Sequence, residues 1–163
     1  MPEKKTRAAA AKDKREGKSS STQAGEYVRE EIEHVREGKH GARSARQAIA
    51  IGLSKARRDG VKVPVSKSAS ESTRKKARQD EAASHEDASP APKRAAATKK
   101  VLKKEGHQAA SKTALSRHAS KSASGRTPSS RSVAAKKAAQ TKGVAGRSAA
   151  AKKAARTRAR SKS

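Results

Sequence analysis

Cysteine, tryptophan and phenylalanine are absent from the 163-residue chain, and Tyr27 is its single aromatic residue. Without cysteine the protein has no disulfide, no thiolate chemistry and no cysteine-based zinc site. One aromatic residue is too few for RNA-binding modules that stack bases on aromatic side chains. No run of apolar residues approaches the length of a membrane span, and residues 1–20 lack the apolar centre of a secretory signal. We therefore expect an intracellular protein without a membrane span.

Large apolar side chains are also few. Alanine accounts for 35 of the hydrophobic residues, which leaves 16 larger ones for the whole chain. Low hydrophobicity together with a net charge of +27 leaves the conformational entropy lost on folding uncompensated. This composition predicts a mostly disordered chain. It also argues against a buried pocket, so we expect no enzyme, no catalytic residue, no bound cofactor and no small-molecule substrate.

Positive charge dominates and is concentrated toward the C-terminus. The chain has 42 Lys and Arg against 15 Asp and Glu. Residues 93–163 alone carry 21 basic residues and a single acid, Glu105, which gives this part a net charge of +20. Such a charge indicates a polyanionic partner, and the abundant polyanions inside cells are DNA, RNA and anionic membrane surfaces.

The distribution of charged and apolar residues divides the chain into four parts. Residues 1–20 form a basic arm and residues 93–163 a Lys/Ala-rich basic tail, both expected to be disordered. Residues 66–92 form a polar linker with an acidic cluster at Asp80, Glu81, Glu86 and Asp87. Ten of the 16 large apolar residues lie within residues 21–65, so only this part is expected to fold alone.

Residues 21–65 show the periodicity of an all-α helical hairpin. Apolar residues line one face of a helix near 22–37, with Ser21 or Thr22 as its N-cap and Gly38 as its end. Tyr27 lies on this apolar stripe, while four glutamates follow another face that would repel phosphate: Glu26, Glu30, Glu33 and Glu37.

The second helix of the hairpin is predicted near 44–59. Ser44 and Gln47 have the spacing of a capping box, and Gly60 ends the helix. Gly52 and the neighbouring alanines are small, so the two helices can approach closely. The alternating valines of residues 61–65 predict a short extended strip laid across the hairpin. A hairpin of this size is marginal alone, and a homodimer through its apolar faces is the expected remedy.

The tail contains an internal repeat. Residues 131–142, Arg-Ser-Val-Ala-Ala-Lys-Lys-Ala-Ala-Gln-Thr-Lys, recur sixteen residues later with conservative changes at residues 147–158. Alanine and lysine favour helix, but paired lysines repel and no apolar stripe is present. We expect this segment to be disordered when free and to become helical when phosphates neutralise it.

Exposed cations of the second helix and the tail are the candidate DNA-binding residues, because phosphate contact requires only charge and reach. They are Arg43, Arg46, Arg57, Arg58, Lys99, Lys100, Lys103, Lys104, Arg131, Lys136, Lys137, Lys142, Arg147, Lys152, Lys153, Arg156, Arg158 and Arg160. The alternative for the helix residues is a solvated surface without a partner. The five histidines show no pair spaced by four residues and no accompanying ligand cluster, so no metal site is expected.

The stretch from Gly25 to Arg58, with its central motif Arg36-Glu-Gly-Lys-His-Gly-Ala-Arg-Ser44, resembles a small bacterial domain family of unknown function. Members of that family are generally described as DNA-binding or plasmid-stabilisation proteins, and the resemblance implies no catalytic residue. The Ala-Ala-Lys-Lys-Ala-Ala blocks of the tail are similar to linker-histone tails and bacterial histone-like proteins. That similarity implies duplex binding and compaction without base readout.

Together these features predict a histone-like, largely sequence-independent DNA-binding protein that neutralises phosphates and condenses or bridges DNA. It would be cytoplasmic and nucleoid-associated in a bacterium, or nuclear in a eukaryote. One alternative is a regulatory module whose hairpin binds a protein while the tail localises it. A second alternative is an RNA- or ribosome-associated basic factor.

Overall fold

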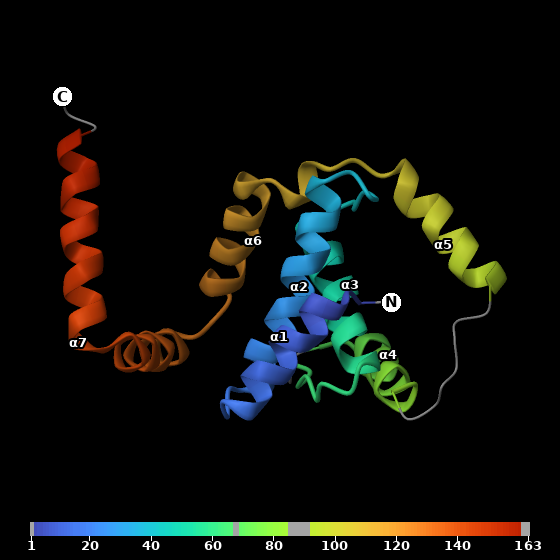
Figure 1. The fold of residues 1–163 in the computed structure, drawn as a ribbon, viewed down its shortest axis with the longest axis horizontal. Coiled ribbons are helices and arrows are strands. Elements are labelled where there is room, and N and C mark those ends of the chain that lie inside the picture. The colour runs from blue at the N-terminus through green and yellow to red at the C-terminus, as the bar shows by residue number, and fades with distance from the viewer. Residues whose placement is uncertain (1, 67–68, 85–91, 161–163) are drawn as a thin grey trace. The chain divides into compact units, whose positions relative to one another are not determined.

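The computed structural model describes residues 2–66, 69–84 and 92–160, and this part of the chain contains helices and no strand (Figure 1). The chain divides into two compact units, residues 1–118 and residues 119–163. No helix among the described residues combines the length and the apolarity that a membrane crossing requires. In chain order the elements are α1 (Lys4–Arg15), α2 (Ser20–Arg36), α3 (Ala45–Arg58), α4 (Glu71–Ala82), α5 (Pro92–Lys104), the 3-10 turn η1 (Gln108–Ala110), α6 (Lys112–Ser124) and α7 (Pro128–Arg160).

The expectation of a mostly disordered chain with a single hairpin is wrong. Unit 1 surrounds the hairpin of α2 and α3 with α1, α4 and η1, and the tail forms α5, α6 and α7. Alanine explains the difference, because nine of the eleven buried apolar residues in the described part are alanines. Burying alanine costs no side-chain entropy, and its small volume lets helices approach. The count of large side chains therefore understated what this chain can bury.

The hairpin itself follows the predicted signals closely. Ser19 caps α2 by accepting a hydrogen bond from the Thr22 backbone N–H at 3.3 Å, slightly before the predicted cap. Gly38 follows α2 with a positive φ of 75°, as predicted for the residue that ends this helix. At the crossing with α3, a Cβ on Gly52 would lie 2.7 Å from Val28 Cα. The predicted close approach of the two helices is therefore confirmed.

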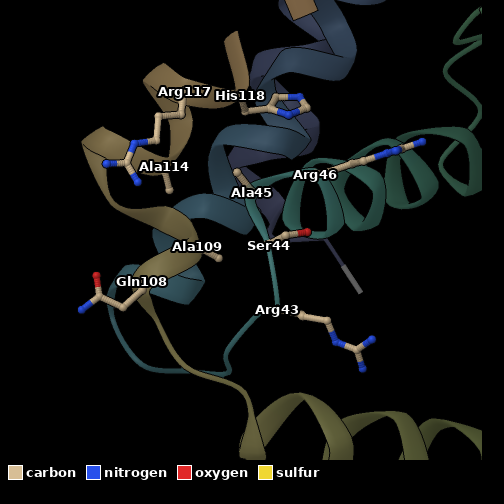
Figure 2. A pocket seen from close by; sticks show the side chains of 9 residues that line it. All are labelled: Arg43, Ser44, Ala45, Arg46, Gln108, Ala109, Ala114, Arg117 and His118. Carbon is tan, nitrogen blue, oxygen red and sulfur yellow. The ribbon is translucent and has the colours of Figure 1, made fainter. Parts of the chain in front are cut away.

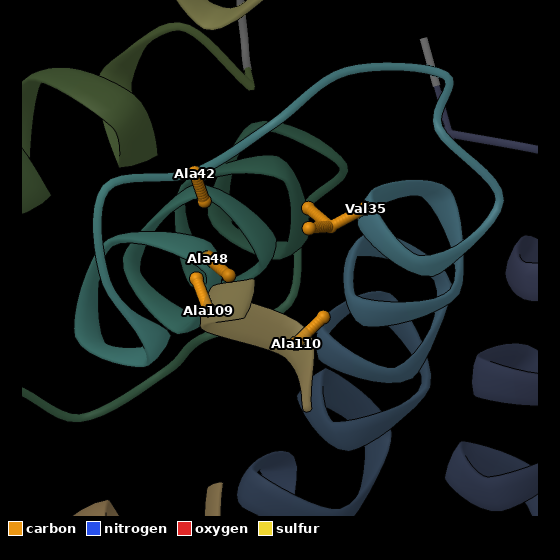
Figure 3. Packing of buried hydrophobic residues seen from close by; sticks show 5 residues of the cluster. All are labelled: Val35, Ala42, Ala48, Ala109 and Ala110. Carbon is orange, nitrogen blue, oxygen red and sulfur yellow. The ribbon is translucent and has the colours of Figure 1, made fainter. Parts of the chain in front are cut away.

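Two apolar clusters hold unit 1 together. The first joins α2, the loop after it, α3 and η1 through Val35, Ala42, Ala48, Ala109 and Ala110 (Figure 3). The second joins α1, α2 and α3 through Ala10, Ala24, Tyr27 and Ala56, and Leu53, Val61 and Val63 pack against it. The non-helical strip after α3 thus packs against the hairpin as the alternating valines predicted. Because α1 and η1 cover the hairpin's apolar faces, a single chain buries these faces without the homodimer that the sequence led us to expect.

Polar contacts attach the other helices of unit 1. Asp59 accepts hydrogen bonds from the Tyr27 hydroxyl and from Arg7 of α1, whose Nη2 lies 2.7 Å from Asp59 Oδ1. Burial and this hydrogen bond to Asp59 raise the pKa of Tyr27. In the last turn of α5, the Leu102 carbonyl accepts a hydrogen bond from the Gly41 N–H at 2.9 Å, and a Cβ on Gly41 would overlap the Glu105 carbonyl. Glycine is therefore required where this loop meets the end of α5.

The predicted linker contains α4, which buries Ala77 and the carboxylate of Asp80. Asp80 is 1% exposed and accepts hydrogen bonds from Ser54 at 2.5 Å and Arg58 at 2.9 Å, with Lys76 Nζ 3.0 Å away. Burial raises the pKa of Asp80, but these three contacts outweigh burial and hold the pKa below its ordinary value. Of the predicted acidic cluster, Glu86 and Asp87 lie outside the described residues.

The tail forms helices because intrinsic propensity outweighs charge repulsion. Alanine, lysine, arginine and glutamine are all strong helix formers, and they make up most of α7. Adjacent lysines such as Lys136 and Lys137 do not face each other on a helix, so their repulsion is smaller than the sequence argument assumed. Gly143, with φ of 65° and ψ of 174°, interrupts α7 between the two copies of the repeat. The bend is visible where the ribbon turns from orange to red (Figure 1).

Candidate nucleic-acid interface

The N-terminus of α3 presents two of the predicted arginines. Ser44 Oγ accepts the Gln47 backbone N–H at 3.2 Å, and Gln47 Oε1 accepts the Arg43 N–H at 2.8 Å. The predicted serine cap is confirmed, whereas the glutamine reaches one residue further back than a capping box requires. This fixed turn places Arg43 just before α3 and Arg46 in its first turn, both exposed.

A shallow pocket of about 370 Å³ lies beside this helix start (Figure 2). Arg43 and Arg46 line one side, and Arg117 and His118 of α6 line the other, over a base that includes Ala109. The guanidinium groups point outward around the pocket rather than toward a common centre. An extended polyanion suits this arrangement better than a small anion, because separate phosphates can meet separate cations.

The sequence did not identify Arg117 and His118 because α6 was not predicted as a helix. The signal that could have found it is Ser111, which precedes the segment Lys-Thr-Ala-Leu and whose Oγ accepts the Ala114 N–H at 3.1 Å. That cap begins α6, from which Arg117 and His118 line the pocket beside the start of α3. Glu105 is the carboxylate beside this patch, with Oε1 3.6 Å from Arg43 Nε.

The C-terminus of α3 behaves differently. Arg58 is occupied by the buried carboxylate of Asp80 and holds α4 in place. Arg57 is partly buried, and its Nε has no hydrogen-bond partner in the described part of the chain. The two ends of this 14-residue helix are about 20 Å apart. The four predicted arginines of α3 therefore form two separate pairs, and Arg58 has a structural role.

Four predicted lysines lie on α5 and are all exposed. Lys99 and Lys103 are four residues apart, as are Lys100 and Lys104, so the four side chains form two adjacent rows on one side of the helix. Like charges at this spacing repel each other by a few tenths of a kcal/mol. A phosphate placed between them would remove that cost.

The predicted residues of the repeat lie on α7, which has no buried residue. Its 33 residues contain ten basic side chains and no acid: Arg131, Lys136, Lys137, Lys142, Arg147, Lys152, Lys153, Arg156, Arg158 and Arg160. Because they follow no helical period, they surround the helix instead of forming one face. Across the bend, Arg147 Nη1 donates to the Ala139 carbonyl at 2.6 Å. Each helical segment of α7 thus carries one copy of the repeat.

Acidic groups of the hairpin are largely directed inward. Glu30 and Glu31 are 2% and 0% exposed, and Lys55 Nζ lies 3.6 Å and 2.6 Å from their oxygens. Burial raises the pKa of Glu30, but hydrogen bonds from Thr6 and the Glu3 N–H, together with Lys55, hold the pKa below its ordinary value. A hydrogen bond with His34 is the main reason that the pKa of Glu3 is lowered to about 2. Glu30 and Glu3 therefore stay ionised at neutral pH, and the burial of Glu30 and Glu31 makes them oppose an approaching phosphate less than an exposed row would.

One group of side chains has the composition of a metal site. Glu31 and His34 of α2 and His40 of the following loop each offer a ligand atom within 4.8 Å of the other two. No two histidines are four residues apart, so the sequence predicted no metal site here. The overlooked signal is Glu31-x-x-His34, whose spacing of three places both side chains on the same face of a helix.

Comparison with known proteins identifies one domain. Residues 12–67 match a family of unknown function (DUF6496), a range that includes α2 and α3 and the last residues of α1. The expected domain of unknown function is therefore present. No curated protein and no solved structure matches the chain. Unit 1 of this protein accordingly contains a DUF6496 domain, to which the comparison assigns no site residue.

Proposed function

We propose that this protein binds duplex DNA through its phosphate backbone, without reading base sequence, and condenses or bridges DNA. The observation that carries the proposal is α7, whose two helical segments span 33 residues with ten cations, no acid and no buried residue. A helix that is polar on every side has no apolar face for a protein core. Its side chains are suited to neutralising phosphates, which releases the counterions condensed on DNA.

The distribution of cations on α7 favours bridging between DNA segments over insertion of one helix face into a single DNA groove. Lysines and arginines surround each helical segment, so phosphates on opposite sides can be contacted at once. Gly143 separates two segments that carry equivalent repeats, which gives each molecule two similar cationic helices. Two linked binding elements raise avidity through effective concentration. By this proposal the protein acts at the nucleoid of a bacterium, in keeping with the histone-like character of its tail.

Unit 1 supplies a second cationic surface in support. The pocket beside α3 gathers Arg43, Arg46 and Arg117, and the carboxylate beside it, Glu105, lies 3.6 Å from Arg43. The positive end of the α3 dipole adds to the potential there. This surface fits the same ligand class as α7, namely a phosphate chain.

A salt series tests the proposal. Full-length protein is titrated against a labelled duplex of mixed sequence, and binding is followed by fluorescence anisotropy from about 50 to 200 mM salt. If about ten phosphates are contacted, log K should fall with log salt at a slope near −9, a loss of several orders of magnitude in affinity. A flat salt dependence would refute the proposal, and equal affinity for unrelated duplexes is expected.

A matched pair of variants locates the effect on α7. Changing Lys136, Lys137, Lys152 and Lys153 to glutamine removes four charges while keeping strong helix formers. The slope should become less steep by about 3.6, because each phosphate contact contributes about 0.9. The four corresponding Lys→Arg changes keep the charge and should leave the slope unchanged. If both variants retain the wild-type slope, α7 is not the binding element.

Substitution tests this better than deletion of residues 93–163, because that deletion removes Ala109 and Ala110 from the core of unit 1. A parallel titration with single- and double-stranded RNA at equal phosphate concentration decides between DNA and RNA. Tighter RNA binding would replace the proposal with an RNA-associated function. Undiminished partner capture by the Lys→Gln variant in nuclease-treated extract would favour a protein-binding module.

A further inference from the structure

We propose that Glu31, His34 and His40 form a binding site for a divalent transition-metal ion, with zinc as the best-suited ion. Each of the three residues places one ligand atom within 4.8 Å of the other two, and His34 also contacts Glu3 Oε1 through Nε2 at 2.9 Å. Glu31 and His34 are fixed by the last two turns of α2, and His40 comes from the loop that follows. The proposed site is independent of the DNA-binding surfaces.

Glu31 is the first independent observation that points to a ligand. Its side chain is 0% exposed, and neither carboxylate oxygen has a hydrogen-bond partner in the described part of the chain. Lys55 Nζ lies 2.6 Å from Oε2 and His40 Nε2 lies 3.1 Å from Oε1, so charge and distance are favourable while hydrogen-bond geometry is not. A buried carboxylate without hydrogen bonds is costly, and a metal–oxygen bond would satisfy it.

The second observation is the orientation of His40. Its Nδ1 lies 3.0 Å from the Gly41 carbonyl oxygen, which can only accept a hydrogen bond. The Nδ1–H therefore donates to this carbonyl, and in the neutral imidazole Nε2 carries the lone pair. This nitrogen lies 3.1 Å from Glu31 Oε1 but is not aligned for a hydrogen bond with it. A backbone carbonyl that fixes the imidazole tautomer is the usual outer-shell partner of a metal-binding histidine.

The donor set selects the kind of ion. Two imidazole nitrogens with one carboxylate oxygen suit zinc and neighbouring first-row transition metals, whereas magnesium and calcium prefer oxygen ligands alone. Three protein ligands leave a fourth tetrahedral position for water. Coordination through Oε1 leaves Oε2 with Lys55, so the ion and the ammonium group can be accommodated together.

A bound ion would tie the end of α2 to the loop that leads into α3. That loop also contains Gly41 and Ala42, whose N–H groups donate to the carbonyls of Leu102 and Gly106. The ion would therefore stabilise the junction of α2, α3 and the segment after α5. Metal binding should raise the thermal unfolding midpoint of unit 1, because a ligand that binds only the folded state stabilises it.

The test uses untagged, full-length protein freed of metal with a chelator. Isothermal titration with zinc chloride should show one site with Kd of about 10 µM or tighter. His40→Asn keeps an amide that can reach the Gly41 carbonyl but removes the Nε2 ligand, and His34→Gln changes the second imidazole. Each should weaken zinc binding by at least about 100-fold, because loss of an outer-shell partner alone weakens metal binding by about 10- to 100-fold and loss of a ligand should weaken it more. The control His118→Asn should bind as the wild type does.

Nitrogen-detected imidazole spectra of the wild-type protein give an answer that does not depend on how the variants fold. Zinc at one equivalent should shift the nitrogens of His34 and His40 and leave those of His118 unchanged. Magnesium chloride at the same concentration should shift none of them. Shifts spread over all histidines, equal zinc affinity in wild type and His40→Asn, or no binding below about 100 µM would overturn the proposal.

Discussion

Gly52 allows the most decisive test of the fold, because replacing it with alanine puts one methyl group between two helices. The added Cβ would lie 2.7 Å from Val28 Cα and 3.0 Å from the Tyr27 carbonyl oxygen. These are backbone atoms of α2, so no rotamer change can relieve the overlap, and α2 and α3 must move apart.

Two opposing effects set the magnitude. Replacing glycine by alanine within a helix normally stabilises by about 1 kcal/mol. Overpacking of a tight interface costs typically 1–3 kcal/mol, and contact with backbone places Gly52→Ala toward the upper value, at about 3 kcal/mol. We expect a net loss of about 2 kcal/mol in the free energy of unfolding. Gly25 of α2 provides the matched control, since a Cβ there meets nothing within 4 Å and Gly25→Ala should stabilise by about 1 kcal/mol.

Tyr27 provides a specific signal for the assay. It is the only aromatic residue, it is 2% exposed, and it lies in the cluster between α1, α2 and α3. Near-ultraviolet circular dichroism during urea unfolding therefore reports on unit 1 without a contribution from the tail helices. The two glycine variants should shift the unfolding midpoint in opposite directions. A shift of the same sign for both would refute the packing of α2 against α3.

Three further predictions follow from single contacts. Asp80→Ala should release α4 and cost about 2 kcal/mol, seen as faster amide exchange in residues 71–82. The pKa of Asp80 is lower in the folded than in the unfolded protein, so ionised Asp80 stabilises the fold above the ordinary carboxyl pKa. This stabilisation is lost as the pH falls through the lowered pKa, and amide exchange in α4 should then become faster. Amide exchange rates in α4 that stay the same relative to unfolded peptide at acid pH would contradict this. Gly143→Ala should make α7 a continuous helix and increase the 222 nm signal, because alanine disfavours a φ of 65°; an unchanged signal would show that the bend has another cause. Ser44→Ala should cost about 1 kcal/mol through loss of the α3 cap and speed amide exchange in the first turn of α3. Ser54→Ala, which loses the hydrogen bond to Asp80 instead, should leave exchange in that turn unchanged, and faster exchange there in both variants would contradict the cap.

Local signals in the sequence predicted the hairpin well. The serine cap of α3, the glycine after α2 and the small residue at the helix crossing depend on neighbours within one turn or on the volume of one side chain. The same holds for the non-helical valine strip that packs on the second cluster. Such features are decided by the residues themselves, so a linear pattern is enough to find them.

The candidate site was predictable in charge but not in arrangement. The sequence identified every lysine and arginine of α7 as exposed and basic, and composition alone determines this. It could not show that Arg58 would be held by Asp80, twenty-two residues away, or that Arg117 would line the same pocket as Arg43. Pairings over such separations depend on where whole helices pack, which the local pattern does not encode.

By itself the sequence determined the caps of the hairpin, its apolar stripe, the repeat and the overwhelming positive charge, because each follows from composition or short spacing. Only the tertiary structure decided that α1, α4 and η1 enclose the hairpin and that Glu31 meets His40. Alanine is the physical reason for the first, since its value in a core depends on how closely neighbouring backbones approach. The second depends on a glycine-containing loop that turns His40 back over α2, and no residue count reveals that path.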